Sequence, residues 1–535
     1  MTNKGVHHKV FIYDTTLRDG AQGEGISFSV EDKLALLKRL DTSGVQYVEG
    51  GWPHPSNLKD TEFFRRASRL RLNHVRLAAF GSTRKAGIPA AKDINLKGLL
   101  DAKTPAVAIV GKAWDMHTRE ILGVSLAENL AMVRESVSFL KGRGREVLFD
   151  AEHFFDGWKA NKEYALEVLK TAESAGASWL VLCDTNGGTL PEEVRGIVGA
   201  LKGRLHVPLA IHAHNDCECA VANSLAAVTA GATQVQGTLN GFGERTGNAN
   251  LCSVIPALKV KMGVDCVSDA QLKGLRALSM FAFETATRSP RDEMPFVGSS
   301  AFAHKAGLHV HAVEKNPRAV EHMDPELVGN RRHVVISDQA GLAAVRWKAE
   351  GYGFKLPKGS ERGKLVLAEL KRKEEAGYNY EGAEASFELL VQRVLAKTRP
   401  YFRLLEYRVS VEHRDDKMVS EAALKVAVDG TDEHTVAVGD GPVNALDAAL
   451  RKALSRFYPA VRLMHLVDYR VRVINPAAAT AAKVRVAIES TDGRENWSTV
   501  GVSENIIDAS WQALADSVEY CLKSNGVKPR GSRGR

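Results

Sequence analysis

From residue 10 to about residue 265, the chain alternates short runs rich in β-branched residues with amphipathic stretches, and it does so eight times. This alternation is typical of repeated strand–helix units that share a parallel sheet. Eight such units within about 250 residues favour a closed (β/α)8 TIM barrel of the α/β class over an open sheet. The open sheet is also disfavoured because no glycine-rich dinucleotide fingerprint follows the first strand. The expected strands are Val10–Thr15, Gln46–Gly50, Arg76–Phe80, Ala106–Val110, Glu146–Phe149, Trp179–Cys183, Leu209–His212 and Gln234–Thr238.

The chain continues well beyond the expected barrel, with two further kinds of pattern. Helical stretches interrupted by loops come first, and a β-rich region begins near residue 399. There a run of three strands and a helix occurs twice, with Lys425–Gly430 and Arg485–Ser490 in corresponding places. We therefore expect a C-terminal α+β regulatory domain with an internal pseudo-twofold repeat. The expected boundaries are 1–270 for a TIM-barrel catalytic domain, 271–398 for a helical linker that completes the active site, 399–525 for the C-terminal domain and 526–535 for a disordered basic tail.

The composition of the chain argues against a membrane-spanning, exported or nucleic-acid-binding protein. Hydrophobic residues make up 44% and charged residues 25% of the chain, as in ordinary globular proteins, and no apolar run is long enough to span a bilayer. The polar segment Met1–Lys9 lacks the apolar core of a signal peptide, and six scattered cysteines indicate free thiols in a reducing compartment. We therefore expect a cytoplasmic protein. The net charge of +8 suits anionic substrates, but no basic patch interleaved with aromatic residues indicates nucleic acid.

Two segments far apart in the chain hold residue types that bind divalent metal ions. Asp19 follows the first expected strand, and His212 and His214 lie at the end of the seventh. Residues i and i+2 of a strand point the same way, so both imidazoles can reach one ion. One carboxylate and two imidazoles suit Mn, Mg or Zn and leave positions open for substrate. The alternative is a pair of core histidines that bond to the backbone.

Arg18 stands directly before the expected carboxylate ligand. A guanidinium next to a metal site is repelled unless an anion lies between them, which predicts an anionic substrate here. A metal ion with open positions can chelate an α-keto acid and polarise its carbonyl group. Arg18 would then neutralise the oxyanion, although an ordinary ion pair at the barrel mouth is the alternative role.

These residues carry a resemblance to a known family. The segments Asp14–Gly20, His212–Asp216 and Gly243–Asn248 resemble the barrel of metal-dependent enzymes that condense acyl-CoA with α-keto acids, within the DRE-TIM metallolyase superfamily. This family includes 2-isopropylmalate, homocitrate and citramalate synthases. The resemblance covers the chain up to about residue 525, and three further segments are most similar to the citramalate branch: Gly50–Pro53, Phe302–Val310 and Tyr380–Leu390.

The resemblance implies an activity and roles for single residues. Acetyl-CoA would condense with pyruvate, and hydrolysis of the thioester would give (R)-citramalate and CoA, a step toward 2-oxobutanoate and isoleucine. Arg18, Glu152 and His309 would be catalytic, with the last two serving proton transfer. Thr185 matches the position that contacts the carboxylate of the keto acid, and Asn248 matches an asparagine beside the metal ion.

Two positions depart from the family pattern. Asp150 occupies a place that is aromatic or hydroxylated in several relatives, and it bears on the choice of keto acid as a substrate-binding residue. His311 stands where an acidic or small residue is common. A second imidazole there could compete with His309 or add charge on the acyl-CoA side.

The C-terminal repeat resembles the allosteric domain of these synthases. This implies a homodimer and feedback inhibition by a branched-chain amino acid, with isoleucine the natural effector of a citramalate-forming enzyme. A purely structural dimerisation domain is the alternative.

Three other functions remain open at this point. A 2-isopropylmalate synthase would use 2-oxoisovalerate, and a pocket distinguishes one methylene by only about 1–3 kcal/mol. A non-catalytic amino-acid-binding regulatory protein would keep the barrel in a degenerate form. A carbon–carbon lyase like the HMG-CoA lyases would share the metal ligands, but those lyases resemble only the barrel.

Overall fold

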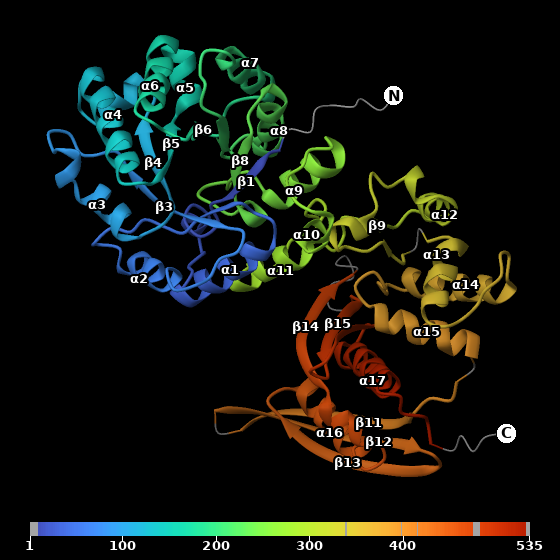
Figure 1. Cartoon of the computed structure of the whole chain (residues 1–535). Coiled ribbons are helices and arrows are strands. Elements are labelled where there is room, and N and C mark those ends of the chain that lie inside the picture. The colour runs from blue at the N-terminus through green and yellow to red at the C-terminus, as the bar shows by residue number, and fades with distance from the viewer. Residues whose placement is uncertain (1–8, 338–339, 397, 415, 475–481, 531–535) are drawn as a thin grey trace. The chain divides into compact units, whose positions relative to one another are not determined.

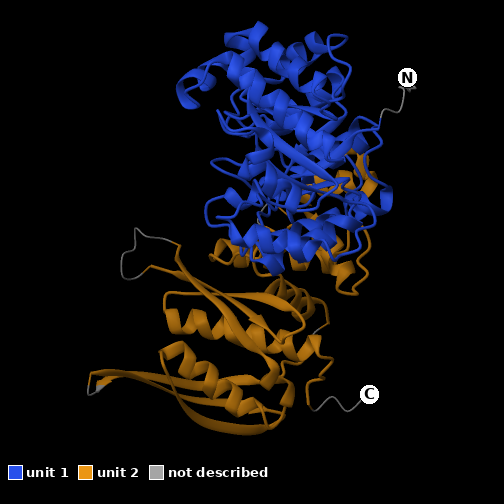
Figure 2. Ribbon diagram, turned by 60° about the vertical axis from the view of Figure 1, so that its left-hand side comes forward, with its two compact units in different colours: residues 1–302, 323–332 blue, residues 303–322, 333–535 orange. Residues whose placement is uncertain are grey.

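The computed structural model describes residues 9–337, 340–396, 398–414, 416–474 and 482–530 (Figure 1). The chain forms two compact units, Met1–Phe302 with Met323–Arg332 and Ala303–His322 with His333–Arg535 (Figure 2). The predicted linker is therefore divided between the units. Helices beyond residue 270 bury Leu272, Leu275 and Phe283 in the core of the barrel unit, which places the boundary later than predicted.

The first unit is built around a closed barrel of eight parallel strands in sequential order, as predicted (Figure 1). β1 closes the barrel against β8, with Ile12 opposite Val235. Successive strand residues face opposite sides, so Leu180 and Leu182 join the main core, while Val181 joins a separate buried cluster. Both sides of the strands are buried, which explains their nearly continuous apolar sequence. The strands are β1 (Phe11–Asp14), β2 (Tyr47–Glu49), β3 (Arg76–Ser82), β4 (Ala106–Lys112), β5 (Glu146–Glu152), β6 (Trp179–Asp184), β7 (Leu209–Ala213) and β8 (Gln234–Gly237).

Helices surround the barrel (Figure 1). α1 begins at a capping box, in which Ser29 and Asp32 exchange hydrogen bonds. Because each helix follows the carboxyl end of a strand, the connecting loops gather at one end of the barrel. The helices are α1 (Val30–Thr42), α2 (Leu58–Ala67), α3 (Ile94–Asp101), α4 (Leu126–Gly142), α5 (Phe154–Ala160), α6 (Lys162–Ser174), α7 (Pro191–Leu201), α8 (Ala220–Ala230), α9 (Leu251–Pro256), α10 (Asp269–Lys273) and α11 (Leu275–Thr285).

Several barrel strands run further than the sequence pattern predicted, and β4 and β5 are the examples that bear on the site. β4 extends to Lys112 and β5 to Glu152, whereas the apolar runs end at Val110 and Phe149. The pairing continues through polar positions, with Asp150 opposite Val110 and Glu152 opposite Lys112. Polar side chains interrupt the apolar pattern, but the backbone hydrogen bonds between the strands continue past them. A prediction from the apolar pattern therefore ends these strands too early. Glu152 is therefore held on a strand and not on a loop.

The second unit begins with a helical part that has its own core. Val345, Leu370 and Phe387 are buried there. Its elements are the paired strands β9 (Ala303–His304) and β10 (His333–Val334) and the helices α12 (Gly307–Lys315), α13 (Leu342–Gly351), α14 (Glu361–Glu375) and α15 (Glu384–Ala396).

The predicted C-terminal repeat is confirmed by two antiparallel three-stranded sheets, each followed by a helix. The repeats also match in detail, because the first strand of each shifts register near its start, between Leu404 and Glu406 and between Leu466 and Asp468. The first repeat is β11 (Arg403–Arg414), β12 (Lys417–Val428), β13 (Thr431–Gly439) and α16 (Pro442–Leu454); the second is β14 (His465–Val473), β15 (Val484–Thr491), β16 (Asn496–Ser503) and α17 (Ile506–Ser524).

The end of the chain is partly held in place. The Tyr401 hydroxyl donates a hydrogen bond to the Val527 carbonyl at 2.7 Å, and the Arg530 N–H donates to the Tyr458 hydroxyl at 3.2 Å. The predicted disordered tail therefore does not begin at residue 526, and residues 531–535 lie outside the described residues. Within the described part of the chain, no helix combines the length and the apolar character needed to cross a membrane.

Candidate active site at the carboxyl end of the barrel

The three side chains predicted to bind a metal ion converge at the carboxyl end of the barrel strands. His212 lies on β7, His214 follows that strand, and Asp19 lies in the turn after β1. Oδ2 of Asp19 is 3.1 Å from Nε2 of His212 and 3.9 Å from Nε2 of His214. The two Nε2 atoms are 3.3 Å apart. One oxygen and two nitrogens within 4.8 Å of one another, all on buried residues, can hold a divalent metal ion.

Neighbouring polar groups orient both imidazoles. Nδ1 of His212 lies 3.0 Å from Oε1 of Gln236, so Nδ1–H donates to the amide oxygen and Nε2 points toward Asp19. Nη2 of Arg245 lies 3.3 Å from Nδ1 of His214, and Asp216 holds that guanidinium at 2.8 and 2.9 Å. A ring held at one nitrogen presents the other in a fixed direction, as in metal sites generally.

The charges in this cluster also suit cation binding. Burial acts to raise the pKa of Asp19, but Arg18 and the hydrogen bond with His212 outweigh it and lower that pKa well below its ordinary value. Burial and the neighbouring His212 lower the pKa of His214 to about 4. Burial acts to lower the pKa of His212, and its bond to Asp19 raises it above the usual value. At neutral pH the cluster thus offers a charged carboxylate and a neutral imidazole, while cation binding competes with a proton on His212.

Arg18 is fixed beside the cluster by a carboxylate that sequence analysis did not single out. Its Nε donates to Oε1 of Glu49 at 2.5 Å, and its guanidinium lies 3.8 Å from the centre of the Phe80 ring. The Tyr13 hydroxyl donates to the other oxygen of Glu49 at 2.7 Å. Nη1 of Arg18 is 3.5 Å from Oδ1 of Asp19, so the guanidinium faces the candidate metal ligands. A charged residue ending an otherwise apolar strand is the signal that could have identified Glu49.

Asn248 reaches the cluster through the loop after β8, where its backbone forms a bridge with His214. The close turn requires glycine at Gly247, because its φ is +90° and a Cβ there would lie 1.9 Å from the Gly241 carbonyl oxygen. Both side-chain amide atoms of Asn248 are buried without a hydrogen-bond partner among the described residues. Buried amides are costly when unpaired, so this asparagine fits a site that takes an ion with its water or substrate.

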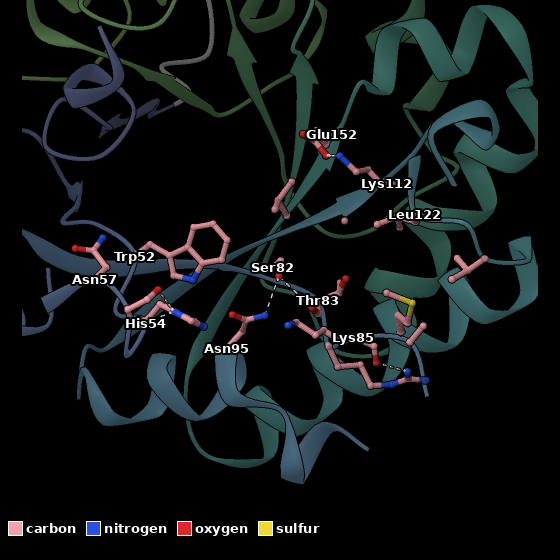
Figure 3. A pocket seen from close by; sticks show the side chains of 17 residues that line it. Trp52, His54, Asn57, Ser82, Thr83, Lys85, Asn95, Lys112, Leu122 and Glu152 are labelled. Atoms are coloured by element: carbon pink, nitrogen blue, oxygen red, sulfur yellow. Dashed lines mark hydrogen bonds and ion pairs between the residues drawn. The ribbon is translucent and has the colours of Figure 1, made fainter. Parts of the chain in front are cut away.

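A second group of polar residues lies on the neighbouring strands β4 to β6. Lys112 and Glu152 form an ion pair (Figure 3). Asp150 is buried, and its Oδ1 has no hydrogen-bond partner within the described residues. Burial, and then the nearby Glu49, raise the pKa of Asp150 above its ordinary value, which favours the neutral form that can donate a hydrogen bond. Thr185 lies just beyond β6 and accepts the N–H of His153 at 3.0 Å.

A cavity of about 760 Å³ opens beside the Lys112–Glu152 pair. Figure 3 shows Trp52 and Lys85 among the side chains around it, with Lys112 reaching toward Glu152. The lining also includes Val110 and Met132, so it combines charged and apolar groups. A cavity of this size and character accommodates part of an extended amphipathic ligand.

His309 and His311 lie on α12 in the second unit, and both side chains are exposed. Nδ1 of His311 is 4.0 Å from Oε2 of Glu314, a residue of the same helix. The assigned role of His309 therefore remains a prediction, and the residues described above form the candidate site of the first unit.

Comparison with known families agrees with this architecture. Residues 9–281 match the HMGL-like family model, residues 296–377 the homocitrate synthase post-HMGL domain-like model, and residues 381–522 the LeuA allosteric (dimerisation) domain. The fold and the site together define an HMGL-like barrel enzyme with an added LeuA domain.

Individual relatives narrow the class. The chain is 52% identical to the (R)-citramalate synthase of Geobacter sulfurreducens, covering 96% of this chain and 97% of that protein. It is 51% identical to the (R)-citramalate synthase of Aquifex aeolicus, covering 96% and 98%. A probable 2-isopropylmalate synthase of Methanopyrus kandleri is 32% identical, covering 95% and 98%. The chain belongs to the (R)-citramalate synthase family.

Proposed function

We propose that the chain is an acyltransferase that condenses acetyl-CoA with pyruvate and water to give (R)-citramalate and CoA. The observation that carries this proposal is the convergence of Asp19, His212 and His214 beside Arg18, in a chain of this family. Identity is higher to the citramalate synthases than to the 2-isopropylmalate synthase, which favours pyruvate over 2-oxoisovalerate. The assembled ligands and the family disfavour a non-catalytic binding protein.

The first group of residues binds the keto acid. Asp19, His212 and His214, with Asn248 beside them, would hold a divalent cation, which when bound supplies Lewis-acid polarisation of the keto group. Arg18 stabilises the negative charge that develops on the keto oxygen. Asp150 in its neutral form and the hydroxyl of Thr185 can donate hydrogen bonds to the carboxylate of pyruvate.

The second group moves protons. Glu152 takes a proton from the methyl group of acetyl-CoA, and the enolate carbon attacks the keto carbon of pyruvate to form the new carbon–carbon bond. The keto oxygen receives the electron pair of its former π bond beside Arg18 and is then protonated. Water next attacks the thioester and releases CoA. His309 completes the acid–base pair in this proposal, on the strength of the family resemblance.

Acetyl-CoA fits the cavity beside Glu152. Its pantetheine arm is amphipathic and its phosphates are anionic, and the lining offers Trp52 and Met132 together with Lys85. Because Glu152 lies on the wall of this cavity, a thioester bound there would present its methyl group near the proposed base.

The test is a CoA-release assay with acetyl-CoA and a panel of α-keto acids. The protein would be stripped of metal by a chelator and then assayed with Mn, Mg or Zn restored singly. We expect release with pyruvate that requires a divalent cation. Release with 2-oxoisovalerate and not with pyruvate would overturn the substrate assignment, and no release with any keto acid would overturn the enzyme itself.

The second unit supports regulation of this reaction. A cavity of about 710 Å³ is lined by α16 and by the segment that leads into β14. It combines Asp447, whose Oδ2 accepts from Nε of Arg451 at 2.7 Å and whose Oδ1 is buried without a partner within the described residues, with Arg462 and the apolar side chains of Val443 and Leu466. A free amino acid needs one anionic, one cationic and one apolar partner. We therefore propose feedback inhibition by a branched-chain amino acid, isoleucine, in a homodimer.

The proposed cellular location is the cytoplasm. All six cysteines are free thiols, four of them buried. Free thiols persist in reducing compartments such as the cytosol.

A further inference from the structure

We propose that Lys112 is a positioning residue that holds the Glu152 carboxylate in the orientation needed to take a proton from the acyl-CoA; this inference rests on the proposed function. Lys112 ends β4 and Glu152 ends β5, directly opposite each other in the ladder. Opposed residues of a parallel pair project to the same side of the sheet, so the side chains of Lys112 and Glu152 extend from the same face. Nζ of Lys112 contacts Oε2 of Glu152, and both residues line one cavity (Figure 3).

The backbone beneath both side chains is fixed. The Glu152 carbonyl accepts the Ala113 N–H at 3.2 Å, which ties the end of β5 to the residue after Lys112. The Lys112 carbonyl accepts the side-chain amide of Asn129 at 2.8 Å, and Asn129 is fully buried on α4. The backbone of Lys112 is therefore held rigidly at the end of its strand. From this fixed position its ammonium group holds the Glu152 carboxylate in place.

This geometry matters because a glutamate is a flexible base. Its side chain has several rotamers of similar energy, and ordering such a side chain costs conformational entropy. The Lys112 and Glu152 side chains are only 20% and 24% exposed, so solvent screens their attraction less than that of a surface pair. A base displaced by about 1 Å can cost about 100-fold in rate. The ion pair between Lys112 and Glu152 therefore raises the rate of proton transfer by keeping the base in place.

Two other possible roles of Lys112 would affect different measured quantities. A lysine that only stabilises the barrel mouth would change the thermal midpoint and not the chemistry. A lysine that only attracts the phosphates of CoA would change KM for acetyl-CoA and leave kcat unchanged. The positioning role alone acts through Glu152.

The experiment replaces Lys112 with methionine, which keeps the length of the side chain and removes its charge. We expect kcat for CoA release from acetyl-CoA with pyruvate to fall about 10- to 100-fold, with both KM values within about threefold of wild type. Lys112→Arg should restore most of the rate. In a Glu152→Gln background, Lys112→Met should cause no more than about a twofold further loss, because the residue it positions is already disabled.

The matched control is Arg76→Met, which removes the ion pair between Arg76 and Glu146 at the opposite end of β5 and should leave kcat unchanged. Circular dichroism checks folding, and Lys112→Gln serves if the methionine variant does not fold. Unchanged kcat in Lys112→Met, a loss confined to KM for acetyl-CoA, or an undiminished loss in the Glu152→Gln background would each overturn the positioning role. A wild-type protein inactive with every keto acid would instead overturn the proposed function.

Discussion

His212 shows how a single buried side chain can serve both fold and chemistry. One ring nitrogen bonds to Gln236, and the other faces Asp19 and His214. A histidine with a purely structural role in the core would not need titratable groups such as Asp19 and His214 beside its second ring nitrogen. Nδ1 of His212 therefore serves the fold, and Nε2 remains available to bind a ligand.

Replacing His212 with alanine is expected to lower CoA release more than about 100-fold, because even loss of a residue that only supports a ligand costs about 10- to 100-fold. The fold should persist, since the barrel core is elsewhere complete. CoA release, metal content and circular dichroism would be measured together. His206→Ala is the control, because that side chain is exposed. Full metal content and turnover in His212→Ala would remove this residue from the ligand set.

Asp14 predicts a pH dependence of stability. Burial raises its pKa from 3.8 to about 7, although hydrogen bonds from Thr16 act to lower it. The folded state therefore binds more protons than the unfolded state between these values, and this contribution to stability is lost as the pH rises from about 4 to about 7. This difference in pKa corresponds to at most about 4 kcal/mol of unfolding free energy.

Asp14→Asn should remove that pH dependence, because an amide is neutral throughout and can still bond to both Thr16 groups. Relative to wild type, the thermal midpoint of the variant should rise steadily between pH 4 and pH 7. Asp41→Asn is an opposite control. Burial acts to raise the pKa of Asp41, but backbone N–H groups of three residues lower it overall, so its contribution is lost as the pH falls. A constant difference between Asp14→Asn and wild type would contradict the prediction.

At the scale of elements, the loop after β8 is the part of the site most dependent on backbone shape. Gly247→Ala should weaken metal binding and CoA release by at least about 10-fold, because the added Cβ would lie 1.9 Å from the Gly241 carbonyl oxygen and displace Asn248. Calorimetric titration with Mn would give the metal affinity. Gly203→Ala is the matched control: its φ is +76°, but open space surrounds the Cβ position. Equal affinity in both variants would show that this loop does not shape the site.

The strands and helices were predictable to the extent that they depend on local alternation. The eight barrel strands, the capping box at Ser29 and the C-terminal repeat follow from patterns within short windows. The Arg18–Glu49 and Lys112–Glu152 pairs were not predictable, because barrel closure and strand register bring these residues together. The ends of β4 and β5 were missed for the same reason, since their last residues are polar and only the ladder keeps them extended.

At the scale of the whole molecule, two units carry separate tasks in one chain. The first unit holds the candidate metal ligands and the cavity beside Glu152, and the second holds the charged cavity beside α16. If isoleucine binds the second unit, inhibition must arise from a difference in its affinity for active and inactive states. Binding to the native state alone would also stabilise the protein by about 2.7 kcal/mol at 100 times the dissociation constant.

Arg462→Ala should remove both effects of isoleucine while leaving basal CoA release intact, since this cation lines the cavity and would pair with the carboxylate of the effector. The measurements are the isoleucine dependence of CoA release and the shift of the thermal midpoint on adding isoleucine. Arg470→Ala is the control, because that exposed arginine pairs with Asp468 and does not line the cavity. Undiminished inhibition in Arg462→Ala would move the effector site elsewhere, whereas loss of the thermal shift together with inhibition would link this cavity to control of the barrel.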